Sequence, residues 1–430
     1  MPKAVVIGAG VGGLTTAIAL QRKGWDVTVL ERAQSIDPVG SGLAIAANAL
    51  KALDTLGLGD RLRSLSRVQG QAGIRRPDGR WLVQTTEDNA RERYGDSVVV
   101  ALRATLMDIL VGALAPDALR LNTAVTAVDP ATGIVHTAPA NNPSLPDTWA
   151  GTGTGTGTGD GVGELVADLV VAADGIHSVT RRTIFPAHPG PRYSGVTAWR
   201  GLVPSPGLRI PSSESWGKGL VFGSHQVADD LVYFYATDLS PAGAVHEDER
   251  AELLRRFDDW HDPIPQLLRD ADPARIIRND VYYLDTPLPA YHSGRVALVG
   301  DAAHPMTPNL GQGACQAIED AIVLAHLVDG DVAGGLEAYT AARLERTSKI
   351  VSRSMSVCRA TKVRNPVAVR VRDAAMSLAG KLSSDRMLKS MDDLLGWQPP
   401  ISSSAAPTAA TDPVTGPTGA QGNATPSRRR

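Results

Sequence analysis

The chain has 430 residues, a formal net charge of -2, and 43% hydrophobic and 20% charged residues. This length predicts two or three domains, and the near-neutral charge gives no electrostatic reason to expect nucleic acid as a partner. Two cysteines support neither a disulfide framework nor a cysteine-rich metal site, and they favour a reducing cytoplasm. Nine scattered histidines contain no HxH or HxxxH pair, so we expect no metal.

The N-terminus carries the pattern of a dinucleotide-binding loop. An apolar strand, Ala4–Ile7, leads into glycines at positions 8, 10, 12 and 13, a helix follows, and a second strand ends at Glu31. Such glycines permit a tight turn and a close approach to a pyrophosphate, and the acidic residue can bind a ribose. A purely structural turn is the alternative. The glycines also argue against a secretory signal, and no other apolar run of about 20 residues suggests a membrane span.

Two later strands also end in acidic residues beside glycine. Asp174 and Gly175 follow an apolar strand at 165–173, and Gly300 and Asp301 follow another at 296–299. Ligands of open α/β sheets bind at the carboxyl ends of strands, although a local helix cap is the alternative for each aspartate. Glycines 311 and 313 precede the helix at 314–327, whose free N–H groups would face an electron-rich ligand.

The order of patterns predicts an α/β chain interrupted by a smaller antiparallel domain. Residues 343–390 hold twelve Lys or Arg against three acidic residues, which indicates a solvated helix face or, less favoured, peripheral contact with an anionic membrane. The predicted parts are a first dinucleotide-binding segment at 1–180 with a flexible Gly/Thr insertion at 138–163, an inserted domain at 181–283, a second dinucleotide-binding segment at 284–340, C-terminal helices at 341–398 and a disordered tail at 399–430.

Three motifs together resemble those of the class A FAD-dependent aromatic monooxygenases, the p-hydroxybenzoate hydroxylase-like family. They are GxGxxG from Gly8 to Gly13 with Glu31, DGxxSxxR from Asp174 to Arg181, and GDAAHP from Gly300 to Pro305 with Pro308, Gly311 and Gly313. The stretch from Gly294 to Gly313 is most similar to the salicylate hydroxylase, urate hydroxylase and zeaxanthin epoxidase branch. The resemblance implies a Rossmann-like FAD-binding domain of the GR2 type, with an inserted antiparallel-sheet substrate domain and C-terminal helices.

The resemblance also implies the activity. NAD(P)H would reduce FAD, and O2 would form a flavin C4a-hydroperoxide that hydroxylates or epoxidises a small aromatic, alkene or polyketide-like substrate. Asp174 and Gly175 would serve both FAD and NAD(P)H, and Arg103 is similar to an arginine that reaches FAD. The residues expected at the cofactor are Gly8, Gly10, Val11, Gly12, Gly13, Glu31, Arg32, Gly42, Arg103, Asp174, Gly175, Arg181, Gly300, Asp301, Pro308, Leu310, Gly311, Gln312 and Gly313.

The inserted domain supplies the expected substrate contacts. Arg200 is the candidate for orienting an anionic or phenolic substrate, because a guanidinium donates in a fixed fork. His225, Tyr233 and Tyr235 are candidates for contact or proton relay, although most aromatic residues in strands belong to the core. Cys315 stands where many family members have Asn, and a small buried residue is favoured there over a reactive thiol.

Two other classes stay open from the sequence. A flavin-dependent dehydrogenase or reductase would keep all three motifs but insert no oxygen, and a flavin-binding sensor would oxidise no NAD(P)H. We expect a cytoplasmic monomer or homodimer with a small-molecule substrate.

Overall fold

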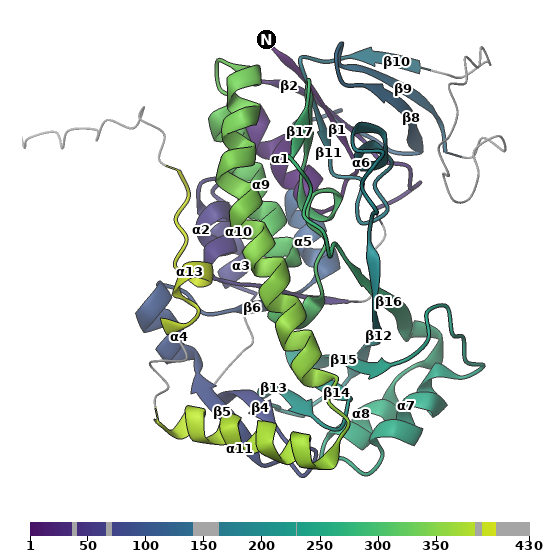
Figure 1. The fold of residues 1–430 in the computed structure, drawn as a ribbon, viewed down its shortest axis with the longest axis vertical. Helices are drawn as coiled ribbons and strands as arrows, with labels where there is room; N and C mark the ends of the chain where they lie inside the picture. The colour runs from purple at the N-terminus through teal and green to yellow at the C-terminus, as the bar shows by residue number, and fades with distance from the viewer. Residues whose placement is uncertain (37–40, 66–70, 141–162, 229, 383–388, 401–430) are drawn as a thin grey trace, which may run out of the picture. The chain divides into compact units, whose positions relative to one another are not determined.

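The computed structural model describes residues 1–36, 41–65, 71–140, 163–228, 230–382 and 389–400 (Figure 1). Most of the expected Gly/Thr insertion and nearly all of the expected tail lie outside these residues. Within the described residues, no helix combines the length and the apolar character needed to cross a membrane.

A six-stranded sheet brings the three strand-end motifs together. Its order is β17 (His292–Ser293), β18 (Val296–Leu298), β11 (Leu169–Ala172), β1 (Lys3–Ile7), β2 (Asp26–Leu30) and β7 (Leu119–Arg120). All neighbours are parallel except β17 and β18. The strands β18, β11 and β1 are adjacent, so their carboxyl ends deliver Asp301, Asp174 and Gly8 to one edge of the sheet.

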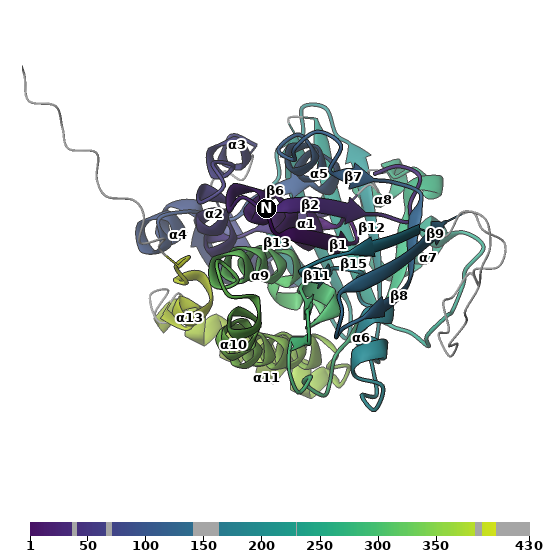
Figure 2. The same ribbon diagram turned by 90° about the horizontal axis from the view of Figure 1, so that it is seen from above.

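Alternation along β1 explains the layers around this sheet. Val6 joins a core with the helices on one face, whereas Val5 and Ile7 pack toward a three-stranded sheet on the other. Figure 2 shows β1 between α9 and β8. The helices that share the first core include α1 (Val11–Arg22), α2 (Ala47–Asp54), α3 (Gly59–Arg63), α5 (Arg103–Val111), α9 (Gly313–Leu327) and the first turns of α10 (Val332–Thr361). The smaller sheet comprises β8 (Thr123–Asp129), β9 (Ile134–Pro139) and β10 (Gly163–Val166).

A seven-stranded sheet forms the second part. Its order is β16 (Ile277–Tyr283), β12 (Arg192–Pro204), β15 (Leu231–Leu239), β14 (Val221–Ala228), β13 (Ser212–Trp216), β4 (Gln71–Arg75) and β5 (Trp81–Thr86). All pairs are antiparallel except β13 and β4. The strands β4 and β5 come from the segment before residue 181, so this sheet draws on more of the chain than the expected substrate domain at 181–283.

The two faces of the seven-stranded sheet have different partners. The helices α7 (Glu249–Phe257) and α8 (Ile264–Asp270) cover one face, where Trp199, Phe222 and Phe234 are buried. On the other face, Tyr233 packs with Val100 of a two-stranded ribbon formed by β3 (Gly42–Ile45) and β6 (Val99–Leu102). The second face is therefore the one that meets the FAD-binding part.

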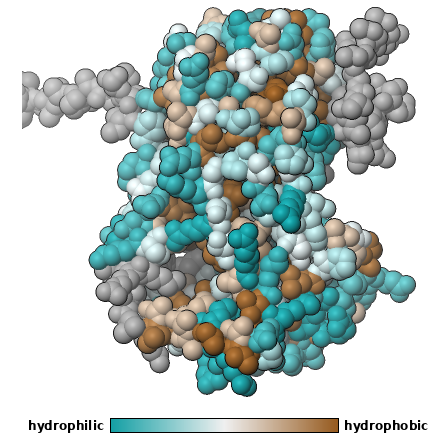
Figure 3. Space-filling view, viewed as in Figure 1, coloured by the Kyte–Doolittle hydropathy of each residue, from teal (hydrophilic) through white to brown (hydrophobic). Residues whose placement is uncertain are grey.

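The expected C-terminal helices are present as α10 (Val332–Thr361), α11 (Pro366–Leu382) and α13 (Asp392–Leu395). On α11, Val367 and Val371 are 66% and 64% exposed. Figure 3 shows apolar residues at the lower edge of the view, where α11 lies. The shorter helices are α4 (Glu87–Tyr94), α6 (Val179–Ile184), η1 (Pro273–Arg275), η2 (Gly300–Ala302) and η3 (Pro308–Leu310). The predicted fold class is confirmed.

Candidate active site

The glycine loop after β1 is closely packed at its first and last glycines and open at the middle one. Gly8 has a φ of 100°, and a Cβ there would lie 2.5 Å from the Ala173 carbonyl oxygen. A Cβ at Gly13 would lie 1.9 Å from the Gly8 oxygen, whereas a Cβ at Gly10 would meet nothing within 4 Å. The open approach at Gly10 fits a pyrophosphate that comes close to the backbone.

Glu31 braces this loop from the end of β2. Its two carboxylate oxygens accept hydrogen bonds of 2.8 Å from the N–H groups of Ala9 and Ala33. Each carboxylate oxygen can accept a further bond, so Glu31 can still bind a ribose hydroxyl. Arg32, the next residue, is exposed.

Asp174 presents an unpaired oxygen at the end of β11. Its Oδ2 accepts hydrogen bonds of 3.1 Å from the N–H and the hydroxyl of Thr180, whereas its buried Oδ1 has no partner. A buried oxygen without a donor is costly unless a ligand supplies one. Gly175 follows with a φ of 79°.

Arg181 connects the second and third motifs through the backbone. Its buried guanidinium donates to the carbonyl oxygens of Asp301 at 3.1 Å and Ala302 at 2.9 Å. Burial lowers the pKa of Arg181, and nearby Asp174 opposes that effect. The structure therefore gives this side chain the role of holding the Gly300–Ala302 turn.

Asp301 and Arg103 complete a set of unpaired polar groups. Asp301 is exposed to solvent, but the protein around its carboxyl group removes part of its hydration and raises its pKa. His304 is the strongest of the groups that oppose this rise. Arg103, at the start of α5, also lowers the pKa of Asp301. Neither side chain has a hydrogen-bond partner within the described part of the chain. With Gly10 open and Asp174 Oδ1 unpaired, these groups fit FAD.

The N-terminus of α9 faces the same region. No side chain caps this helix, so the N–H groups of its first turn remain available to a ligand. A Cβ at Gly313 would meet nothing within 4 Å, and Gly311 has a φ of 62°. The Gln312 side chain points into the protein instead, where its oxygen accepts bonds from Asn48 at 3.1 Å and Gln316 at 3.0 Å.

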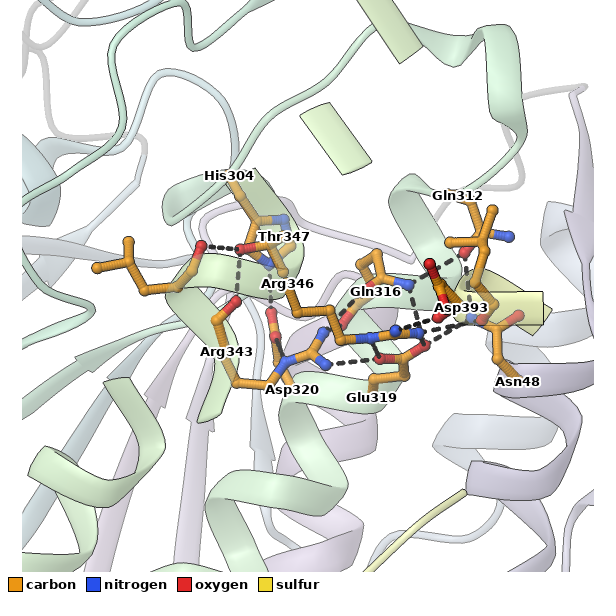
Figure 4. Close-up of polar contacts among 12 residues, drawn as sticks. Asn48, His304, Gln312, Gln316, Glu319, Asp320, Arg343, Arg346, Thr347 and Asp393 are labelled. Atoms are coloured by element: carbon orange, nitrogen blue, oxygen red, sulfur yellow. Dashed lines mark hydrogen bonds and ion pairs between the residues drawn. The ribbon is translucent and has the colours of Figure 1, made fainter. Parts of the chain in front are cut away.

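A buried network of charges holds the α9 helix and the Gly300 turn (Figure 4). Arg343 of α10 donates to Asp320 at 2.6 Å and to Glu319 at 2.5 Å. Asp320 also accepts from the Gly300 N–H at 2.9 Å and contacts His304 at 2.6 Å. Burial alone raises the pKa of Asp320, but His304 and Arg343 outweigh it and lower the pKa to about 2. This carboxylate is therefore ionised at neutral pH.

The seven-stranded sheet presents the expected substrate residues on one face. Tyr235 lies opposite Arg200, and Tyr233 lies opposite His225, in register. The His225 ring centroid lies 5.7 Å from that of Tyr235, and its Nδ1 lies 2.6 Å from the Ser212 hydroxyl. Burial lowers the pKa of His225 to about 4, so the imidazole is neutral at pH 7. The structure thus brings all four predicted residues together.

Burial and a nearby cation act in opposite directions on Tyr233. Burial raises the pKa of its phenol, and Arg200 opposes the rise. The Arg200 guanidinium also donates to Asn279 at 3.1 Å. The guanidinium is only partly buried, so it remains accessible for an anion.

Glu214 belongs to this face but was missed from the sequence. It accepts hydrogen bonds from the Tyr235 hydroxyl and, at 2.7 Å, from the Trp216 indole. Burial raises the pKa of Glu214. An acidic residue two positions before a tryptophan in a short strand was the available signal. The adjacent acids Glu319 and Asp320 in the apolar helix α9 were a second such signal.

Strand β3 joins the substrate face to the helix N-terminus. A Cβ at Gly42 would lie 2.5 Å from the Tyr233 ring, and a Cβ at Gly311 would lie 3.3 Å from Ala44. Two residues along a strand span about 7 Å. The distance between Tyr233 and the N-terminus of α9 is therefore short enough for one aromatic ring system of the cofactor to reach both.

Cys315 is a buried packing residue. It is 0% exposed, its sulfur lies 3.4 Å from the Ala46 nitrogen, and burial raises the pKa of its thiol to about 12. It is therefore not a reactive thiolate.

Comparisons with known proteins agree with this geometry. The family model described as an FAD binding domain matches residues 2–354. The chain is 36% identical to an aurachin C monooxygenase/isomerase from Stigmatella aurantiaca, over 89% of this chain and 95% of the relative. It is 31% identical to an FAD-dependent urate hydroxylase from Mycolicibacterium vanbaalenii, over 85% of this chain and 90% of the relative. The crystal structure of Klebsiella pneumoniae HpxO with FAD and uric acid superposes with a TM-score of 0.80 at 27% identity, over 92% of this chain and 96% of HpxO.

The site defines an FAD-dependent monooxygenase, an oxidoreductase for which NAD(P)H is the usual co-substrate. The chain belongs to the FAD binding domain family, in its class A aromatic monooxygenase branch, as the sequence motifs predicted.

Proposed function

We propose that this enzyme hydroxylates a planar, electron-rich aromatic or heteroaromatic substrate that carries an ionisable hydroxyl, enol or acidic N–H group. The observation that carries the proposal is the face formed by Arg200, His225, Tyr233 and Tyr235, joined by β3 to the α9 N-terminus. A guanidinium, a neutral imidazole and phenols on one apolar sheet suit a flat polar ring better than an aliphatic chain.

Each residue of the face has a distinct role. Arg200 orients the anionic edge of the substrate. When Nδ1–H of His225 donates to Ser212, its Nε2 lone pair can accept the substrate proton, which raises the electron density of the ring. Tyr235 is held by Glu214, so its ring is a fixed wall for the substrate.

The residues at the sheet edge would hold the cofactor. Glu31 would bind the ribose, Gly10 would admit the pyrophosphate, and Asp174, Asp301 and Arg103 would pair with polar groups of FAD. Free N–H groups at α9 would stabilise negative charge on the bound ring system. Bound FAD, reduced by NAD(P)H, supplies the oxygen-transfer chemistry with O2.

The relatives support this substrate class. One is named for aurachin C, another for urate, and HpxO holds uric acid in its crystal structure. Urate is flat and acidic, which matches the residues of the face. We further propose a cytoplasmic monomer or homodimer that binds no nucleic acid.

The test is substrate-stimulated NAD(P)H oxidation by the FAD-reconstituted chain under air, with urate, hydroxyquinolines and hydroxybenzoates. Incorporation of the oxygen label from ¹⁸O2 into product supports the proposal. Turnover without incorporated label would instead indicate a dehydrogenase or reductase. Bound FAD without NAD(P)H oxidation under any substrate would indicate a sensor.

A further inference from the structure

A cavity lies between α10 and the segment from Tyr283 to Tyr291. Its volume is about 260 Å³. Leu288, Met355 and the two tyrosines supply apolar and aromatic walls, and His304 lies among them. The cavity is smaller than the roughly 300–1,000 Å³ of sites for drug-sized ligands, so it suits a single ring. None of the four predicted substrate residues lines it.

His304 gives this cavity a buried polar group without a partner. The side chain is 2% exposed, and its ring centroid lies 5.7 Å from that of Tyr291. Its Nε2 is bound to Asp320, as Figure 4 shows, whereas its Nδ1 has no hydrogen-bond partner. An unpaired buried nitrogen is rare, and a ligand in the cavity would lie beside the ring that carries it.

Arg359 provides the anion-binding group. It lines the cavity and is exposed, so it lies at the opening, and it has no hydrogen-bond or ion-pair partner within the described residues. Asp285 also lines the cavity, but Arg192 and the Tyr283 hydroxyl each donate to it at 2.9 Å. Arg359 lies near enough to Asp285 to lower the pKa of that carboxyl, but it donates no hydrogen bond to it, so the guanidinium can donate to a carboxylate at the opening.

Two hydrogen bonds connect His304, in the wall of the cavity, to the Gly300–Ala302 turn. Asp320 Oδ2 lies 2.6 Å from His304 Nε2 and accepts the Gly300 N–H at 2.9 Å. One carboxylate oxygen therefore links His304, which lines the cavity, to the turn that carries Asp301.

We propose that this cavity is a second ligand site, which binds a small single-ring aromatic carboxylate and transmits its occupancy through His304 and Asp320 to the Gly300–Asp301 turn. The proposal is independent of the substrate that the enzyme oxidises.

The test is calorimetric titration of the FAD-reconstituted chain with benzoate, followed in parallel by the visible spectrum of the flavin. The variants are Arg359→Gln at the opening, Ser352→Trp to fill the cavity, Arg200→Gln on the substrate face, and Arg370→Gln on exposed α11 as the matched control. We expect Arg359→Gln to weaken benzoate binding by about tenfold or more, the loss of one charge-assisted hydrogen bond. Arg200→Gln weakens the substrate face for anions, so in that background Ser352→Trp should abolish benzoate binding. Arg200→Gln alone and Arg370→Gln should retain it with the benzoate-induced spectral change.

The proposal is overturned if benzoate fails to bind at about 10 mM, well above the dissociation constant expected of a ligand this small. It is equally overturned if Arg200→Gln abolishes binding while Arg359→Gln leaves it intact, because the substrate face would then be the site. Benzoate binding at Arg359 without a spectral change would remove the coupling to the turn. If Ser352→Trp does not fold, the comparison of Arg359→Gln with Arg370→Gln decides.

Discussion

The Tyr235 hydroxyl donates a hydrogen bond to the Glu214 carboxylate across an intervening strand. Tyr235 lies on β15 and Glu214 on β13, with β14 between them. Gly223 of β14 makes this reach feasible, because a Cβ there would lie 2.2 Å from the Tyr235 ring. The position of the Tyr235 ring, one wall of the substrate face, therefore depends on Gly223 having no side chain.

Gly223→Ala should displace Tyr235 from Glu214. We expect a loss of about 1–3 kcal/mol in the free energy of unfolding, since the added methyl overpacks a buried contact, together with a fall in turnover. Urea unfolding and NAD(P)H oxidation measure the two effects. Ser224→Ala, on the opposite face of the same strand, is the control. Turnover equal in the two variants would show that the Tyr235 position is immaterial.

Gly10→Ala and Gly13→Ala should separate cofactor binding from folding. The new methyl at position 10 meets no protein atom within 4 Å, so the variant should fold normally but bind FAD more weakly. At position 13 the methyl would overlap the Gly8 oxygen at 1.9 Å, so the variant should lose stability even without FAD. Thermal unfolding of the apoprotein and FAD titration test both statements. Equal FAD affinity for wild type and Gly10→Ala would argue against pyrophosphate binding there.

The sequence predicted the strand-end motifs because each is local, with strand, glycine and acid lying within a few residues. It also singled out Tyr233 and Tyr235, which lie on one face of the sheet because they share the two-residue period of a strand; their contact with a substrate stays a prediction. Long-range pairing could not be predicted. Strands β4 and β5 join the second sheet through the parallel register of Ser213 with Gly73, for which no local pattern exists.

The ionic network shows the same limit. Glu319 and Asp320 are adjacent in the chain, but their partner Arg343 lies on another helix, among twelve basic residues between 343 and 390 that predicted a solvated face. Arg343 is 1% exposed, so this member of the run is buried. Which basic residue pairs with the acids depends on how α10 crosses α9, and charge composition carries no such information.

Asp320→Asn should destabilise the protein strongly. The ionised carboxylate serves Arg343, His304 and the Gly300 N–H, and removing one partner of a buried ion pair typically costs about 3–5 kcal/mol in the free energy of unfolding. Glu345→Gln is the control, because its ion pair with Lys349 is exposed and should contribute little to stability. Denaturant unfolding of both variants measures the difference. If both variants lost a similar free energy of unfolding, the buried network would contribute little to stability.

Arg200→Gln should weaken substrate binding more than it slows turnover. Glutamine keeps a hydrogen-bond donor but loses the charge, so an anionic substrate should bind about 10- to 100-fold less tightly. Steady-state kinetics should show this as a higher KM with kcat changed much less. The exposed Arg209→Gln is the control. Unchanged KM and kcat in Arg200→Gln would remove this residue from the substrate site.

His225 should make stability depend on pH below neutrality. Its folded pKa is lowered to about 4 from an ordinary value of 6.5, because burial disfavours the charged ring. Between these values the unfolded chain binds more protons than the folded one, so stability falls as pH falls from 6.5 to 4. Over this window we expect the contribution of His225 to be on the order of 1–3 kcal/mol.

Substitution of His225 by Gln should flatten that slope, because glutamine does not titrate. Urea unfolding of the FAD-reconstituted protein at several pH values between 7.5 and 4.5 provides the measurement. His177→Gln is the control, since that side chain is exposed. If His225→Gln kept the wild-type slope, the imidazole could not be held neutral by burial. The proposed proton acceptor on the substrate face would then have to be a different group.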